Sequence, residues 1–79
     1  MFKVTALITN TDNKIISGPE EWFVGSFQEC VDELEVYKFQ YDIQDDEIRV
    51  SEDQQEWVFP NNLVGYPKKG ESHFSITAQ

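Results

Sequence analysis

The chain contains very few of the residues that usually bind metals or act as nucleophiles. Among its 79 residues there is one cysteine, Cys30, and one histidine, His73. A structural zinc site needs four Cys or His ligands, so we expect no zinc site within one copy of the chain. A single cysteine cannot form an internal disulfide, which favours a reducing compartment and predicts a cytoplasmic protein.

Long apolar runs and basic clusters are also missing. Segment 1–9 alternates polar with apolar residues and lacks the apolar run of a signal peptide or a membrane span, so we expect no membrane insertion. Six Lys and Arg residues stand against fifteen Asp and Glu, and Lys68 with Lys69 is the one basic pair. Binding to nucleic-acid phosphates requires clustered basic residues, so direct nucleic-acid binding is not expected.

No pattern typical of a catalytic or cofactor site is present. His73 falls on the polar side of a predicted strand and Cys30 on the apolar side of a predicted helix. We interpret them as a solvated surface residue and a small buried hydrophobe. A phosphate-binding loop needs several glycines just before a helix, and only Gly25 stands there. We therefore expect no enzyme, no cofactor and no metal site, with weak calcium binding by clustered surface acids as the alternative.

The first part of the chain predicts a β-hairpin. Residues 2–9 alternate as a strand, the turn formers of 10–13 follow, and an apolar run resumes over 14–16. Gly18 and Pro19 interrupt the pairing, and 21–24 continue the second strand past a bulge or bend.

A helix is predicted after this hairpin. Ser26 and Glu29 match a capping box, which marks the start of a helix. An apolar stripe about 120° wide follows at helical spacing. Its members are Phe27, Cys30, Val31, Leu34 and Tyr37. Lys38 would project from this stripe, so we expect the helix to end near Tyr37.

The rest of the chain predicts further strands. Segments 39–43 and 48–50 form a second hairpin around a turn at 45–46, and a polar turn at 52–55 leads to a strand at 57–59. A loop over 61–72 precedes a last strand at 73–78. The sequence thus predicts one α+β domain over 1–79, a small antiparallel sheet with one amphipathic helix packed on one face, in the order ββαββββ.

Acidity is concentrated in the middle of the chain. Thirteen of the fifteen carboxylates lie between residues 20 and 56, and the formal net charge is −9. On the helix, like charges at i,i+3 and i,i+4 cost roughly 0.2–0.5 kcal/mol each. A surface that tolerates such repulsion favours binding to a cationic groove on another protein, although a surface that only keeps the protein soluble is the alternative. The candidate contact residues are Glu29, Asp32, Glu33, Glu35, Val36, Asp45, Asp46, Glu47, Glu52 and Asp53.

Val36 is the apolar member of this set. It is either a lone exposed residue or an apolar contact point within the charged patch.

In size, acidity and α+β make-up, the chain resembles the small phage-encoded anti-defence proteins, which include anti-CRISPR and anti-restriction inhibitors. The segments that carry the resemblance are Glu29-Asp32-Glu33-Glu35 and Asp45-Asp46-Glu47, which look like phosphate mimics. The resemblance implies a stoichiometric inhibitor. Its partner would be a basic nucleic-acid-binding protein or a nuclease complex in the host cytoplasm.

A competing hypothesis is a structural or adaptor domain that forms a homodimer by pairing sheet edges. Its apolar anchors would be Trp22, Phe23, Trp57 and Phe59. Salt distinguishes the two hypotheses, because capture of a basic partner weakens with ionic strength and apolar association does not.

Overall fold

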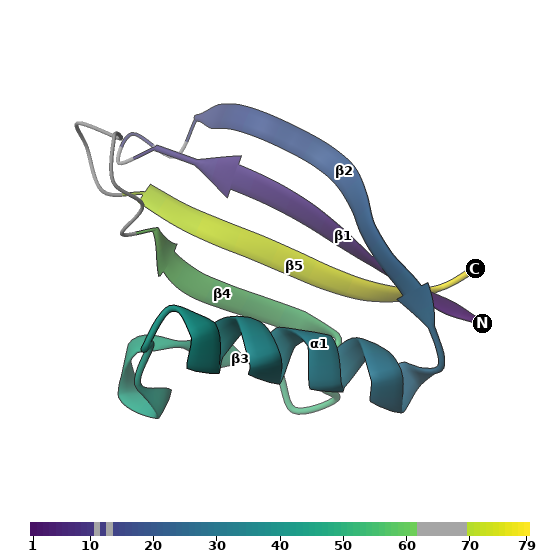
Figure 1. Cartoon of the computed structure of the whole chain (residues 1–79). Helices are drawn as coiled ribbons and strands as arrows, with labels where there is room; N and C mark the ends of the chain where they lie inside the picture. The colour runs from purple at the N-terminus through teal and green to yellow at the C-terminus, as the bar shows by residue number, and fades with distance from the viewer. Residues whose placement is uncertain (11, 13, 62–69) are drawn as a thin grey trace.

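A five-stranded antiparallel sheet carries one helix against one of its faces (Figure 1). The computed structural model describes residues 1–10, 12, 14–61 and 70–79. Along the chain, the elements are β1 (Phe2–Thr9), β2 (Ile15–Gly25), α1 (Phe27–Gln40), the 3₁₀ turn η1 (Asp45–Glu47), β3 (Arg49–Val50), β4 (Glu56–Asn61) and β5 (Gly70–Ala78). In the sheet the strands follow the order β2-β1-β5-β4-β3. The predicted α+β class is confirmed, with five strands in the described part of the chain where six were predicted.

The prediction of a strand over 39–43 is wrong, because α1 continues past Tyr37 and includes residues 38–40. Lys38 suggested the earlier end, since its position falls within the apolar stripe. In the structure its side chain is 19% exposed and its ammonium group reaches two carboxylates at the surface. A lysine can bury its aliphatic stem while its charge stays in water, so this position does not interrupt the helix.

A Schellman motif ends α1. The amide of Ile43 donates to the carbonyl of Lys38 over 3.0 Å, and the amide of Asp42 donates to the carbonyl of Phe39 over 3.2 Å. Asp42 has the left-handed conformation that the motif requires, with φ 54°. Glycine is the usual residue there, so an aspartate at this position hides the end of the helix from sequence analysis.

The predicted hairpin of β1 and β2 is confirmed. In the turn, the side chain of Asn10 accepts hydrogen bonds from the amides of Asp12 and Lys14, each over 3.0 Å. Thr11 and Asn13 lie outside the described residues. The pairing has three register shifts, and one of them falls at 18–19, where the sequence predicted an interruption.

β5 begins at Gly70, before the predicted start at 73, and lies between β1 and β4. Its register with β1 is unbroken from Phe2 opposite Ala78 to Thr9 opposite Glu71. Gly70 approaches Thr9 so closely that a Cβ atom would overlap the backbone carbonyl, so only glycine fits without a shift. Most of the predicted loop 61–72, including Lys68 and Lys69, lies outside the described residues.

The core lies between α1 and one face of the sheet. The helical stripe predicted from the sequence is confirmed: its buried and half-buried members are Phe27, Cys30, Val31, Leu34 and Tyr37. The sheet and the segment after the helix contribute Val4, Ile43, Trp57, Phe59, Phe74 and Ile76. Phe59 and Phe74 meet edge to face with ring centroids 5.4 Å apart, an arrangement that aromatic quadrupoles favour.

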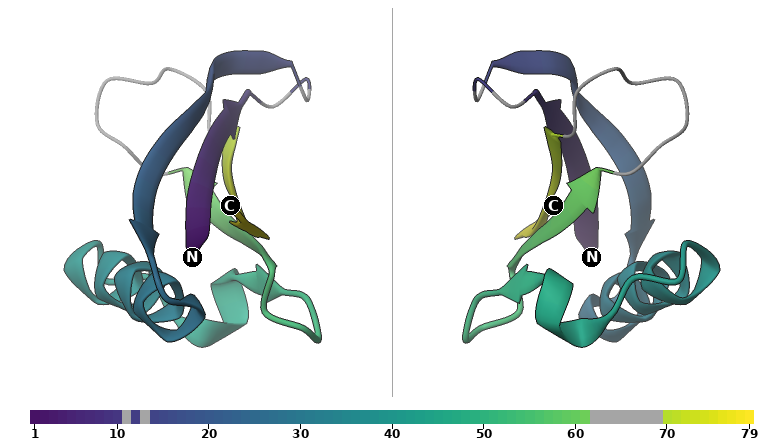
Figure 2. Two further views of the ribbon diagram at one scale, coloured as in Figure 1. Left: turned by 90° about the vertical axis from the view of Figure 1, so that its right-hand side faces the viewer. Right: turned by 90° about the vertical axis from the view of Figure 1, so that its left-hand side faces the viewer.

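Three acidic elements lie along one side of the molecule. α1, η1 and the β3–β4 turn (51–55) all lie on the lower side in Figures 1 and 2, whereas the β1–β2 turn lies on the upper side. The tertiary structure therefore gathers carboxylates that are up to 24 positions apart in the sequence, from Glu29 to Asp53.

Candidate functional site

The predicted contact residues all belong to these three elements. They are Glu29, Asp32, Glu33, Glu35 and Val36 on α1, Asp45, Asp46 and Glu47 in η1, and Glu52 and Asp53 in the β3–β4 turn. Each of these side chains is exposed except that of Glu33, which is half-buried. We use the name acidic face for the part formed by Asp32, Glu33, Glu35, Val36, Phe39, Asp45, Asp46 and Glu47.

Glu29 has a structural role at the start of α1. Its carboxylate accepts a hydrogen bond from the Ser26 amide over 2.9 Å, and the Ser26 hydroxyl accepts one from the Glu29 amide over 3.1 Å. The capping box predicted from the sequence is therefore confirmed. The backbone bond from Ser26, followed by its side-chain bond, holds the pKa of Glu29 below the ordinary value. We leave Glu29 out of the acidic face because it caps the helix.

Lys38 partly neutralises the acidic face. Its ammonium nitrogen lies 3.0 Å from a carboxylate oxygen of Glu35 and also donates to Asp45. The hydrogen bond to Asp45 and then that to Glu35 raise the pKa of Lys38. This cation links α1 to η1, so it holds the two acidic elements together while it cancels part of their charge.

Glu47 and Asp53 accept hydrogen bonds within their own turns. Glu47 accepts from the amide of Gln44 over 3.0 Å. Asp53 accepts from the Ser51 hydroxyl over 2.6 Å and from the amide of Gln55 over 3.0 Å. These bonds, the one from Ser51 first, lower the pKa of Asp53. Both carboxylates stay exposed, but part of their role is to shape the chain.

The other predicted carboxylates make few hydrogen bonds or ion pairs with the described residues. Asp32 accepts a hydrogen bond from the neutral side-chain amide of Gln28 over 2.9 Å and has no ion pair with a described residue. For Glu33, Asp46 and Glu52, no hydrogen bond or ion pair is found with any residue that the structure describes. Glu33 and Asp46 therefore contribute uncompensated negative charge to the acidic face.

Two apolar side chains are exposed on the acidic face. Val36 is 58% exposed and Phe39 is 86% exposed. Phe39 follows Val36 by three positions on the helix, so the two lie on the same side of it. Sequence analysis missed Phe39, because it was assigned to a strand. The absence of Gly and Pro after Tyr37 was the available signal that the helix continues.

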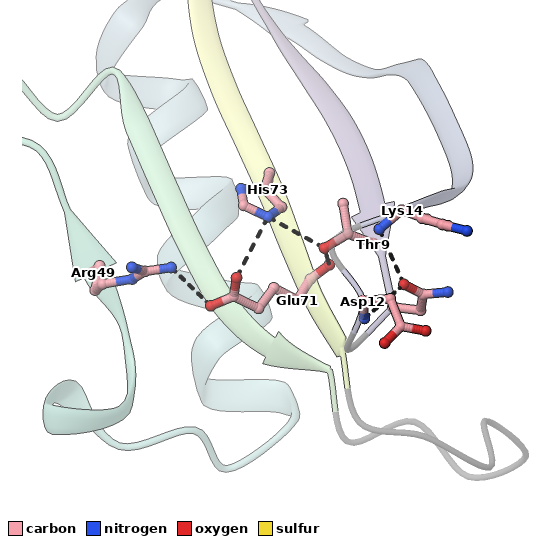
Figure 3. A network of polar contacts seen from close by, with 7 residues as sticks. Thr9, Asp12, Lys14, Arg49, Glu71 and His73 are labelled. Carbon is pink, nitrogen blue, oxygen red and sulfur yellow. Dashed lines mark hydrogen bonds and ion pairs between the residues drawn. The ribbon is translucent and has the colours of Figure 1, made fainter.

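A polar network ties the strands together on the sheet face opposite the helix (Figure 3). Arg49 on β3 pairs with a carboxylate oxygen of Glu71 on β5 over 2.7 Å. His73 Nε2 lies 3.7 Å from the other oxygen of Glu71 and 3.4 Å from the hydroxyl of Thr9 on β1. His73 lies on the polar side of its strand, as predicted, but it is half-buried there and has partners on two strands.

This network lacks the geometry of a nucleophilic site. A nucleophile and an orienting acid need opposite nitrogens of the histidine, whereas Thr9 and Glu71 both approach Nε2. The hydroxyl of Thr9 is also buried and lies 3.5 Å from the carbonyl of Glu71. The thiol of Cys30 is buried in the core, and burial raises its pKa, which makes the reactive thiolate less accessible.

Comparison of the chain with protein-family models, curated proteins and solved structures found no match. Within residues 1–10, 12, 14–61 and 70–79, no group of three or more His, Cys, Asp or Glu side chains is arranged to hold a metal ion. Over the same residues, α1 is too short and too polar to cross a membrane, and no other helix could do so.

Proposed function

We propose that this chain is a non-enzymatic binding protein that blocks a basic, nucleic-acid-binding surface of another protein. In this proposal it is a phage anti-defence inhibitor of the anti-CRISPR or anti-restriction type, and it acts in the cytoplasm of the host cell. The acidic face is the contact surface, and it competes with nucleic acid for the same cationic groove.

The observation that supports the proposal most strongly is the position of Phe39. Its side chain is 86% exposed on a side of the helix where Val36 is the other exposed apolar residue and carboxylates surround the two. Leaving a phenylalanine in water forfeits roughly 1.5–3 kcal/mol that burial would contribute. Interface hot spots combine an apolar anchor with a charged rim, and Phe39 with Val36 among carboxylates has this composition.

The two sheet edges argue against self-association as the main function. The edge strand β2 contains Pro19, two adjacent glutamates and three register shifts, all of which hinder pairing with another strand. The other edge strand, β3, has only two residues. Of the proposed apolar anchors, Trp57 and Phe59 are buried in the core and cannot contact a partner.

The test compares charge reversals inside and outside the acidic face. Glu33→Lys with Asp46→Lys reverses two carboxylates that have no partner among the described residues, so the fold should be retained. Asp12→Lys with Glu21→Lys is the matched control, because it makes the same change in net charge at two exposed positions elsewhere. Each tagged variant is used to capture binding proteins from bacterial lysate, and nucleic acid is then added as a competitor.

We expect the wild type and the control to capture a nucleic-acid-binding protein, and added nucleic acid to release it. The Glu33 and Asp46 variant should bind roughly tenfold or more weakly, a loss of about 1.4 kcal/mol or more. In bacteria with an active CRISPR or restriction system, the wild type should raise phage plaquing efficiency and this variant should not. Equal capture by both double variants, or a partner that nucleic acid does not displace, would contradict the proposal.

A further inference from the structure

A pocket lined by aromatic side chains lies on the flank of α1 that faces β2. Its volume is about 210 Å³. The side chains that matter for its chemistry are Glu20, Trp22, Tyr37, Tyr41 and Phe74. Trp22 meets Tyr37 edge to face with centroids 5.7 Å apart, and Tyr37 lies 4.8 Å from Tyr41. Three elements therefore combine to form one aromatic surface.

A β-bulge directs Trp22 into this pocket. Val4 pairs with Phe23 and Thr5 pairs with Glu21, so Trp22 has no partner in the ladder of β1 and β2. Bulges often re-aim a side chain at a functional site. Here the bulge places the indole against Phe74, with centroids 5.1 Å apart, on the same side of the sheet as the helix.

The aromatic rings of the pocket remain open to solvent. Trp22 is 43% exposed and Tyr41 is 49% exposed, whereas Trp57 of the core is only 2% exposed. The chain therefore buries one tryptophan fully and holds the other at the mouth of a pocket. Phe74, which is 4% exposed, forms a fixed floor beneath it.

The chemistry of the pocket suits an organic cation. The faces of Trp and Tyr rings attract cations within about 6 Å of the ring centroid. The carboxylate of Glu20 stands in the lining, and the whole chain has a net charge of −9.

We propose that this pocket binds the guanidinium group of an arginine on the protein partner. A guanidinium is planar, stacks on aromatic faces, is weakly hydrated and pairs with a carboxylate through two parallel hydrogen bonds. A lysine ammonium matches the carboxylate but not the flat aromatic walls. This inference rests on the proposed function, because it names a group by which a basic partner is anchored in addition to the acidic face.

The binding test uses the isolated chain and small probes. N-acetyl-arginine amide is titrated into the ¹⁵N-labelled protein, with the citrulline amide as its neutral isostere and the lysine amide as a second cation. We expect the arginine probe to shift the indole N–H signal of Trp22 and not that of Trp57. Binding of the citrulline and lysine probes should be roughly tenfold and threefold weaker. Equal binding of arginine and citrulline, or shifts confined to Phe39 and its neighbours, would overturn the assignment.

Two variants connect the pocket to the partner. Glu20→Gln and Tyr41→Leu change exposed positions, so both should fold, and each should weaken the arginine probe and partner capture by roughly threefold or more. Glu21→Gln is the matched control, because its side chain lies on the opposite sheet face, beside Thr5. If the arginine probe binds but both variants capture the partner as strongly as the wild type does, the pocket does not hold an arginine of the partner. That result would overturn this inference and leave the proposed function untouched. If only the Glu33 and Asp46 variant loses capture, the acidic face contacts the partner and the pocket does not.

Discussion

The backbone amide of Ile43 donates a hydrogen bond to the carbonyl oxygen of Lys38 over 3.0 Å. This bond closes the last turn of α1 and directs the side chain of Ile43 into the core, where it is 9% exposed. Phe39 consequently stays on the helix and projects onto the acidic face. The end of α1 thus determines both a core contact and the most exposed apolar side chain of the candidate site.

Replacing Asp42 with glycine should raise the free energy of unfolding by about 0.5–1 kcal/mol. Glycine adopts the left-handed conformation of this position without steric cost, and the change removes a negative charge from the negative end of the helix dipole. Thermal denaturation should show a higher Tm, by roughly 2–8 °C for a domain of this size. Asp42→Ala removes the charge but keeps the steric cost, so an equal gain from alanine would contradict the conformational explanation.

Ser26→Ala should lower the free energy of unfolding by about 1 kcal/mol. The substitution removes the hydroxyl that accepts from the Glu29 amide, and it leaves a helical N–H without its cap. Urea denaturation measures the loss. Ser26→Asp restores an acceptor at the cap and should recover most of the stability, whereas a loss of equal size in both variants would argue against capping as the cause.

The contribution of Glu29 to stability should depend on pH. Bonds from Ser26 hold the pKa of the Glu29 carboxyl below its ordinary value of about 4.5, so the folded protein binds this proton less readily than the unfolded chain. Its stabilisation is therefore fully present above about pH 4.5 and is lost as the pH falls through the lower folded-state pKa. The stability difference between wild type and Glu29→Gln should shrink over that range in urea denaturation.

Glu21→Gln is the control for this measurement, because it removes an exposed carboxylate from β2 and corrects for the general relief of charge repulsion at low pH. A stability difference for Glu29→Gln that stays constant from about pH 6 to about pH 3 would rule out the proposed linkage.

Lys38→Met should strengthen partner capture while it changes stability little. The methionine keeps an apolar stem in place of the lysine stem, and the ion pairs that are lost are partly exposed and worth about 0–1 kcal/mol. Without the ammonium group, Glu35 and Asp45 contribute their full charge to the acidic face. We expect capture to tighten roughly two- to fivefold at low salt and the gain to fade at high salt. Weaker capture would show that Lys38 itself contacts the partner.

Two phenylalanine substitutions separate binding from stability. Phe39→Ala removes an exposed ring, so it should leave the free energy of unfolding within about 0.5 kcal/mol of wild type and weaken capture about tenfold or more. Phe59→Ala removes a ring that is 0% exposed and should cost about 3–5 kcal/mol of stability. Denaturation and capture are measured on the same preparations. Full capture by Phe39→Ala would exclude this ring as an anchor.

Local signals in the sequence predicted most of the secondary structure. The capping box at Ser26 and Glu29, the apolar stripe of the helix and the alternation in β1 each depend on residues a few positions apart, and such patterns reflect backbone geometry that holds in any fold. The outward position of the helical carboxylates followed from the same periodicity. The end of α1 was missed because Asp42, rather than glycine, occupies the left-handed position.

Only the tertiary structure decided which charges are free and which rings are exposed. Lys38 reaches Asp45 through the fold of the segment between them, and a bulge in β2 turns Trp22 toward the helix, so neither relation is encoded by spacing along the chain. Strand order and register likewise depend on contacts between distant residues, such as Thr9 opposite Glu71. Composition and periodicity thus determined an acidic α+β chain, whereas through-space packing determined where that acidity is balanced and where an aromatic pocket opens.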